Sequence, residues 1–296
     1  MDFQMCGGSS TNISNDAPKT ILSDKMYLFK VSSDMSVIAI NNDQKCWFRY
    51  LSAFAVKIGE GAFVLLQISD YDTQNELVSA YTDYDVFPEL VELVRKFDLA
   101  RNNGYHHFVN GLPRNFGGNI DIRYESGEEI SIGDNQSPVF YTDFALALYE
   151  LLKNVIDNHK KELPDAQGIV KIIYNTEFDK SGFVRSELCE NSDGTFTLHK
   201  QSRYDEASQV FEDRFFAKPE LMSKFKETIN NNYMLLWDRF PKSDYTIGDK
   251  KSLTFVFEDG SEVMIFSDRL LPNQFLNAFF SIELELNTCC RNHAIQ

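Results

Sequence analysis

Basic residues, cysteines and long apolar runs are all scarce in this chain. Its 296 residues contain 29 Lys and Arg against 44 Asp and Glu, which gives a formal net charge of −15. Nucleic-acid binding depends on Lys and Arg gathered against phosphates, so we expect no nucleic-acid partner. No segment approaches the roughly 18 consecutive apolar residues of a membrane span, so we also expect no transmembrane segment.

The cysteines argue against both a disulfide framework and a zinc site, because they are scattered, odd in number and without a C-x-x-C pair. They are Cys6, Cys46, Cys189, Cys289 and Cys290. Common catalytic motifs are missing as well, since neither G-x-S-x-G nor H-E-x-x-H occurs. We therefore expect no cofactor and no metal ion, and we assign no catalytic residue.

The N-terminal residues favour a cytoplasmic location, because they contain neither the basic start nor the apolar stretch of a signal peptide. An alternative starts from Cys6, which is followed by a polar segment through Asp16, as in a mature bacterial lipoprotein. If an upstream leader is missing, the protein would instead be an extracytoplasmic lipoprotein anchored to the membrane through Cys6.

The chain does contain enough apolar residues for a sizeable core. Hydrophobic residues make up 43% and aromatic residues 14%, which is typical of a soluble globular protein and excludes wholesale disorder. The length corresponds to one large domain or two medium ones.

An internal repeat is the clearest pattern. Residues 120–132 alternate apolar and polar side chains around a glycine, and residues 253–265 repeat this alternation. Period-two alternation around a glycine-containing turn is typical of a β-hairpin, so we predict two equivalent hairpins. The residues that recur are Glu125, Gly127, Glu129 and Ile132 in the first segment and Glu258, Gly260, Glu262 and Ile265 in the second.

The flanks of the two hairpins also agree. Pro88 and Pro219 each open an amphipathic helix before the hairpin, and Pro138 and Pro272 each precede another helix after it. Strand-like runs come first in each half; in the second half they are residues 169–174, 183–189, 195–199 and 209–211. We predict an α+β fold of two sequence-related halves, each an antiparallel sheet with helices packed on one face.

We expect three regions along the chain. Residues 1–22 form a flexible N-terminal segment, residues 23–158 the first α+β repeat, and residues 168–290 the second. The N-terminal segment has almost no apolar face, so it should be disordered or extended, and its removal should leave the melting temperature nearly unchanged.

Four segments carry a resemblance to a known group of proteins. They are Phe87-Pro88-Glu89-Leu90, residues 111–118, Gln201-Ser202-Arg203-Tyr204-Asp205 and Phe257-Glu258-Asp259-Gly260. Over roughly residues 25–287 the chain resembles an uncharacterised family of bacterial proteins with tandem α+β units, some of which are lipoproteins. The resemblance implies this fold and an occasional lipid anchor, and it implies no activity.

The candidate ligand loop comprises His106, His107, Arg114, Asn115, Gly117 and Gly118. Its glycine amides and the Arg114 guanidinium have the chemistry of an anion site. The loop precedes a strand rather than a helix, so ordinary turn formation is the competing explanation. His106 and His107 are adjacent, and adjacent strand residues point to opposite sides, which argues against a shared metal ion.

We interpret the chain as a non-catalytic binding or interaction module built from a duplicated α+β unit, whose partner is an unidentified protein or small ligand. The alternative is a hydrolase or transferase with a site assembled from scattered polar residues. A concave pocket with carboxylates or histidine would favour the enzyme, and a flat apolar patch would favour the binding module. Trp47 and Trp237 could stack on a sugar, although a place in the core is the commoner fate of Trp.

Overall fold

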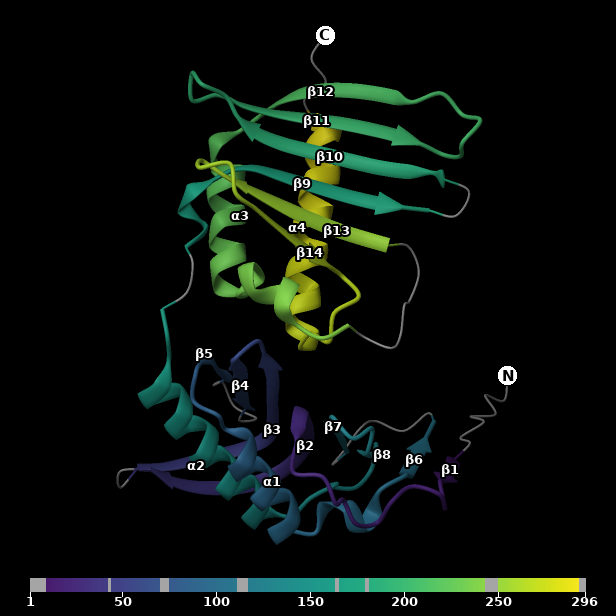
Figure 1. The fold of residues 1–296 in the computed structure, drawn as a ribbon, viewed down its shortest axis with the longest axis vertical. Coiled ribbons are helices and arrows are strands. Elements are labelled where there is room, and N and C mark those ends of the chain that lie inside the picture. Colours follow the sequence, from purple (N-terminus) through teal and green to yellow (C-terminus); the bar gives the residue numbers. More distant parts are fainter. Residues whose placement is uncertain are drawn as a thin grey trace, which may run out of the picture. The chain divides into compact units, whose positions relative to one another are not determined.

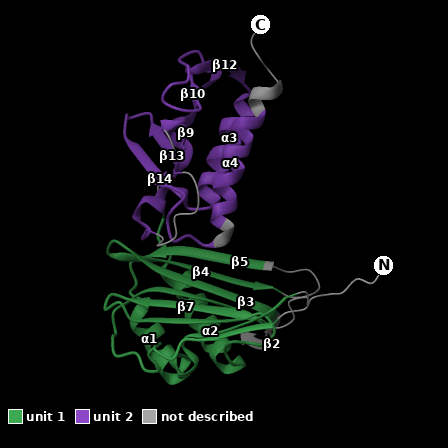
Figure 2. Cartoon of the chain, turned by 90° about the vertical axis from the view of Figure 1, so that its right-hand side faces the viewer, with its two compact units in different colours: residues 1–162 green, residues 163–296 purple. Residues whose placement is uncertain are grey.

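The computed structural model describes residues 9–41, 44–69, 75–110, 117–162, 165–178, 181–242 and 250–292. The fold is α+β, with most of its regular structure in two sheets and with few helices (Figure 1). The chain divides into two compact units, residues 1–162 and 163–296, and each unit contains one sheet (Figure 2).

The first unit contains an eight-stranded sheet in the order β1-β6-β8-β7-β2-β3-β4-β5. Its strands are β1 (Ser9–Ile13), β2 (Met26–Asn41), β3 (Gln44–Ile58), β4 (Gly61–Ser69), β5 (Asn75–Thr82), β6 (Tyr105–Val109), β7 (Gly118–Tyr124) and β8 (Glu129–Asp134). Its helices are α1 (Phe87–Lys96), the short 3₁₀ helix η1 (Leu99–Asn102) and α2 (Thr142–His159).

Helices and strands of the first unit share one hydrophobic core. Phe29 on β2 and Ile122 on β7 lie in this core together with Leu90 of α1 and Phe144 of α2. The apolar side chains of α1 recur every three or four residues and so form one face. Pro88 lies in the first turn of α1, where its missing N–H leaves no helical hydrogen bond unmade.

One pairing in this sheet differs from the expected antiparallel arrangement. β6 pairs with β8 in parallel, with His106 opposite Gly133 and His107 opposite Asp134. The chain reverses once between β6 and β7 and again between β7 and β8, so β8 runs in the direction of β6. Because β2 already occupies the other side of β7, β6 pairs on the outer side of β8.

The N-terminal segment is extended, but it is also docked on the first unit. β1 pairs with β6 although all five of its residues are exposed. The backbone N–H groups of Leu22 and Ser23 donate to the Glu128 carboxylate, each at 2.9 Å, and Ile21 is buried. Main-chain pairing of this kind leaves no apolar pattern in the sequence, which is why the sequence did not indicate it. Residues 1–8, Cys6 among them, lie outside the described residues.

The second unit contains a six-stranded antiparallel sheet in the order β12-β11-β10-β9-β13-β14. Its strands are β9 (Ile169–Glu177), β10 (Phe183–Glu190), β11 (Phe196–Arg203), β12 (Phe211–Ala217), β13 (Lys250–Phe257) and β14 (Glu262–Phe266). Its helices are η2 (Ala166–Gly168), α3 (Pro219–Asn231), η4 (Met234–Arg239) and α4 (Asn273–Asn292). The strand expected at residues 209–211 lies further along, because the polar residues 212–214 interrupt its apolar pattern.

Both predicted hairpins are present and share one register, which confirms that prediction. Ile122 pairs with Ile130 in the first hairpin, and Phe255 pairs with Val263, 133 residues further on, in the second. The two turns are closed by the same hydrogen bonds: the N–H of Gly127 donates to the carbonyl of Tyr124, and the N–H of Gly260 donates to that of Phe257. Both glycines have positive φ, 85° and 83°.

Candidate functional site

The structure explains the described glycines of the predicted ligand loop by close packing. Gly118 begins β7, and a Cβ there would overlap the carbonyl oxygen of Ser32 on β2. A Cβ on Gly117 would overlap the backbone of Asp134 and Asn135. Both positions therefore require glycine for strand packing. Arg114 and Asn115 lie outside the described residues.

The two histidines of the candidate set lie on β6 and have different partners. The His106 ring lies 3.4 Å from the Ser131 hydroxyl on β8, whereas the His107 ring lies 2.9 Å from the Thr11 hydroxyl on β1. Across the described part of the chain, no group of three or more His, Cys, Asp or Glu side chains is placed to hold a metal ion.

His106 does line a hollow of about 580 Å³ in the first unit, together with residues of the N-terminal segment and of the β7–β8 hairpin. Asn103 forms part of the wall. Its carboxamide donates to the carbonyls of Pro18 and Glu129 and accepts from the N–H of Ser131, at 2.7–2.9 Å. These contacts join the N-terminal segment to β8, so this hollow is explained by docking of the N-terminal segment.

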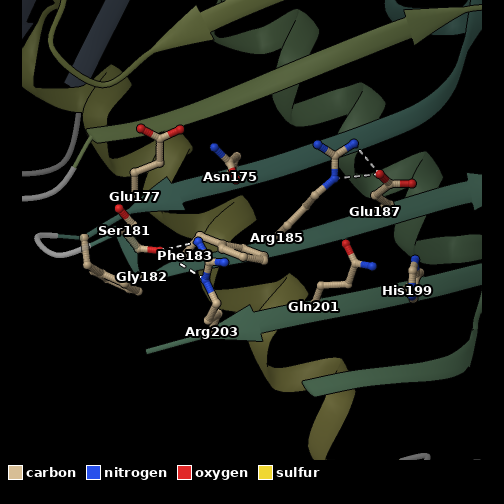
Figure 3. Close-up of a pocket in the computed structure, with 11 residues that line it drawn as sticks. Asn175, Glu177, Ser181, Gly182, Phe183, Arg185, Glu187, His199, Gln201 and Arg203 are labelled. Carbon is tan, nitrogen blue, oxygen red and sulfur yellow. Dashed lines mark hydrogen bonds and ion pairs between the residues drawn. The ribbon is translucent and has the colours of Figure 1, made fainter. Parts of the chain in front are cut away.

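A larger hollow, of about 890 Å³, lies on the second unit and was not indicated by any motif (Figure 3). It is lined mainly by side chains of β9, β10 and β11 on the face opposite to the one that α4 contacts. The lining residues are Asn175, Glu177, Phe178, Ser181, Gly182, Phe183, Arg185, Glu187, His199, Gln201 and Arg203.

Strand register explains why these side chains meet. Arg185 on β10 lies opposite Asn175 on β9 and opposite Gln201 on β11, so a guanidinium and two carboxamides form one row across three strands. Phe183 likewise lies between Glu177 and Arg203 in the adjacent row. Alternate residues of a strand point to the same face, and the hollow therefore uses every second residue of each strand.

The opposite face of the same strands is anchored to α4. The Tyr174 hydroxyl on β9 donates to Glu283 at 2.7 Å, and Lys251 on β13 pairs with the same carboxylate at 2.9 Å. Lys200 on β11 donates to Asn287 at 3.0 Å. Helix α4 thus holds β9, β11 and β13 in place beneath the hollow.

The formal charges of the hollow cancel. Arg185 donates to Glu187, with Nε at 2.7 Å from the carboxylate. Arg203 donates to the carbonyl of Ser181 and lies over the Phe183 ring, 5.3 Å from its centre. Two arginines and two glutamates line the hollow, so its formal charge is zero although the whole chain is strongly acidic.

Other polar groups in the hollow are left for a ligand. Within the described ranges, the side chains of Asn175, Gln201 and Glu177 form no hydrogen bond or ion pair with the protein. Figure 3 shows the Gln201 carboxamide between the Phe183 ring and the His199 ring. A carboxamide has two donor hydrogens and a carbonyl acceptor, so the row combines donors with acceptors.

The tryptophans do not contribute to this site. Trp237 is buried, its indole N–H donates to the carbonyl of Asn232 at 3.0 Å, and its ring stacks on Phe275. The side chain of Trp47 lies outside the described residues. An alternation of polar residues along β9, β10 and β11 is the sequence signal that could have pointed to the hollow, and Gln201 and Arg203 belong to it.

No protein-family model matches this chain, and no curated protein matches it. Among the described residues, no helix is long and apolar enough to cross a membrane.

Proposed function

We propose that the protein is a non-catalytic binding protein whose ligand occupies the hollow on β9, β10 and β11. The observation that carries this proposal is the row of Asn175, Arg185 and Gln201 across three paired strands, in which the two carboxamides have no hydrogen-bond partner among the described residues. Binding sites commonly combine a preformed concave surface with a few placed polar groups, and this row has that character.

An uncharged, hydroxyl-rich ligand, such as an oligosaccharide, fits this lining best. The arginines are already paired, so a phosphate or carboxylate would have to displace Glu187 or Ser181 and would face the Glu177 carboxylate. A sugar hydroxyl both donates and accepts hydrogen bonds, as the carboxamides do. Phe178 and Phe183 provide apolar rings at one end, which suits the C–H face of a sugar.

Calorimetric titration of the full chain with a panel of neutral oligosaccharides tests this function. We expect at least one member to bind, and we expect Gln201→Ala and Asn175→Ala each to weaken its affinity roughly three- to tenfold, the effect of one lost hydrogen bond. The matched control is Gln209→Ala, which removes an exposed carboxamide outside the hollow and should leave the affinity unchanged.

The alternative enzyme function makes a different prediction for the same ligands. The hollow is concave and contains two carboxylates and His199, the features that favour a hydrolase or transferase. If an oligosaccharide is cleaved or transferred by the wild type, and if turnover is lost in Glu177→Gln or Glu187→Gln, the protein is an enzyme and the non-catalytic proposal is wrong.

We further propose that the two units arose by duplication, each with its helices packed on one face of its sheet. Support comes from the equal strand order, in which β8-β7-β2-β3-β4-β5 corresponds to β14-β13-β9-β10-β11-β12. The N–H of Glu125 donates to the carbonyl of Lys25, and the N–H of Glu258 donates to that of Gly168, both at 2.9 Å. Asp98 and Tyr233, both with positive φ, precede η1 and η4 in turn.

We also propose that the chain belongs to the bacterial tandem α+β family that it resembles. For its location we propose the cytoplasm. The competing location is a membrane anchor through Cys6. Translation of the coding sequence upstream of Met1 distinguishes the two locations, because a basic, apolar leader ending in a lipoprotein cleavage site would support the anchor.

A further inference from the structure

β12 is the outermost strand of the second sheet, and no other described strand pairs with its far side (Figure 1). The strand is seven residues long, and Phe211 and Phe216 expose 57% and 62% of their surface. The neighbouring Val210 and Tyr204 are exposed as well. An edge strand of this length with exposed aromatic residues is a ready template for another strand.

The other sheet edges lack this combination. β14 is only five residues long and lies against η4. β1 is also only five residues long and contains no aromatic residue, and on β5 the carbonyl of Tyr81 accepts a hydrogen bond from the N–H of Lys161. Short strands and covering segments are among the means by which sheet edges are protected from pairing.

The N–H and C=O groups of every second residue of β12 point away from β11. The N–H of Asn191 donates to the carbonyl of Thr195 and closes the β10–β11 hairpin. Since hydrogen bonding alternates along an antiparallel pair, β11 bonds β12 through its even-numbered residues, such as Leu198 opposite Phe215. The N–H and C=O groups of the even-numbered residues of β12 therefore face away from the sheet. These residues are Glu212, Arg214 and Phe216.

We propose that β12 pairs antiparallel with β12 of a second copy of this chain, which joins two six-stranded sheets across a two-fold axis. If the two-fold axis is perpendicular to the sheet, the face that contacts α4 lies on the same side of the joined sheet in both copies. Residues that pair across the axis therefore lie on the same face of the sheet. We place the axis at Asp213, so that Asp213 lies opposite Asp213 of the second copy. Glu212 then lies opposite the second copy's Arg214, and Phe211 lies opposite the second copy's Phe215. Symmetry repeats each contact, and isologous interfaces are the commonest kind in homodimers.

This register is the self-complementary one. Within one chain the Glu212 carboxylate already lies 2.6 Å from the His199 ring and 3.7 Å from the Arg214 guanidinium. Across the axis, the Glu212–Arg214 pairs exchange main-chain hydrogen bonds through the outward-facing groups and add a second contact between opposite charges. Val210 then faces the second copy's Phe216. The Asp213 side chains of the two copies face each other at the axis, and within each copy Lys200 on β11 is the cross-strand neighbour of Asp213. Centring on Arg214 would instead oppose two guanidinium groups and set Glu212 against Phe216.

Charge exchange within β12 tests this interface in the full chain. Sedimentation equilibrium should give a dimer for the wild type. In Arg214→Glu, the new carboxylate of each copy lies opposite Glu212 of the other copy, so the interface contains two pairs of like charges. This repulsion should raise the dimer dissociation constant by about tenfold or more. The double variant E212R/R214E reverses both charges, restores the pairing of opposite charges, and should return the dissociation constant to near the wild-type value.

The control is Arg101→Glu, a charge reversal on the exposed surface of η1 that should leave the dimer unchanged. Circular dichroism shows whether each variant is folded. A wild type that stays monomeric at high micromolar concentration would overturn the proposal. Equal dimerisation of the wild type and folded Arg214→Glu, or failure of the double variant to recover, would show that β12 does not pair in this register.

Discussion

Asn103 lies just before β6 in the chain and takes the place of a strand residue beside β8. Its carboxamide bonds both Glu129 and Ser131 of β8, as a neighbouring backbone would, and it also holds Pro18 of the N-terminal segment. The residue is almost completely buried. Buried donors and acceptors that lose their partner pay the full desolvation penalty, so this one side chain stabilises two neighbouring segments.

Asn103→Ala should therefore destabilise the first unit by roughly 2–4 kcal/mol, because it leaves the N–H of Ser131 and two carbonyls without partners. Urea unfolding of the full chain, followed by circular dichroism, measures this change. Asn102→Ala is the matched control, since it removes the neighbouring, exposed carboxamide. If both variants unfold at the same urea concentration, the Asn103 side chain does not stabilise β8 and the N-terminal segment.

Among the secondary-structure elements, the two hairpins have the same register and the same turn hydrogen bonds. Gly127 and Gly260 have positive φ, and a Cβ would contact nothing at either position. Any cost of Gly→Ala therefore comes from backbone strain alone, about 1–2 kcal/mol at each site.

Gly127→Ala and Gly260→Ala should lower the free energy of unfolding of their units by similar amounts, measured by chemical denaturation. Gly168→Ala serves as the control, because its φ is not in the left-handed region and its added Cβ would make an ordinary contact with Phe257 at 3.5 Å. A large effect at one turn and none at the other would contradict the structural equivalence of the hairpins.

The docked N-terminal segment should contribute to the stability of the first unit. Removal of residues 1–22 should lower the melting temperature by several degrees. The truncated chain lacks the buried Ile21 side chain, and Glu128 and Asn103 lose their hydrogen-bond partners Leu22 and Pro18. Removal of residues 1–13 should have a smaller effect, since the side chains of β1 are all exposed. Equal melting temperatures for the full chain and both truncated chains would restore the expectation of a detached tail.

Acid should weaken the same docking. The N–H of Leu22 donates to Glu128 and, together with Ser126 and Ser23, holds the pKa of this carboxyl below its usual value against the opposing effect of burial. A lowered pKa in the folded state stabilises the fold above the carboxyl's ordinary pKa, and this contribution is lost as the pH falls through the lowered pKa. The difference in melting temperature between the full chain and the chain without residues 1–22 should shrink over that acidic range.

At the scale of the whole molecule, local patterns in the sequence predicted more than long-range pairings. The hairpins could be found because Gly127 and Gly260 lie within a few residues of every strand they join. The parallel pairing of β6 with β8 has no comparable sequence pattern, because its main-chain hydrogen bonds join residues that are more than twenty positions apart. The hollow was missed for a similar reason: Asn175, Arg185 and Gln201 become neighbours only after three strands pair in register.

We propose above that the second unit binds an uncharged, hydroxyl-rich ligand in the hollow on β9, β10 and β11. Hydrogen–deuterium exchange of the full chain, with and without the oligosaccharide that binds best, is the measurement that tests this binding site. We expect slower exchange in peptides that cover residues 175–187 and 199–203, and no change in the first unit. Protection confined to the first unit, or an affinity and protection pattern unchanged in Gln201→Ala, would contradict it.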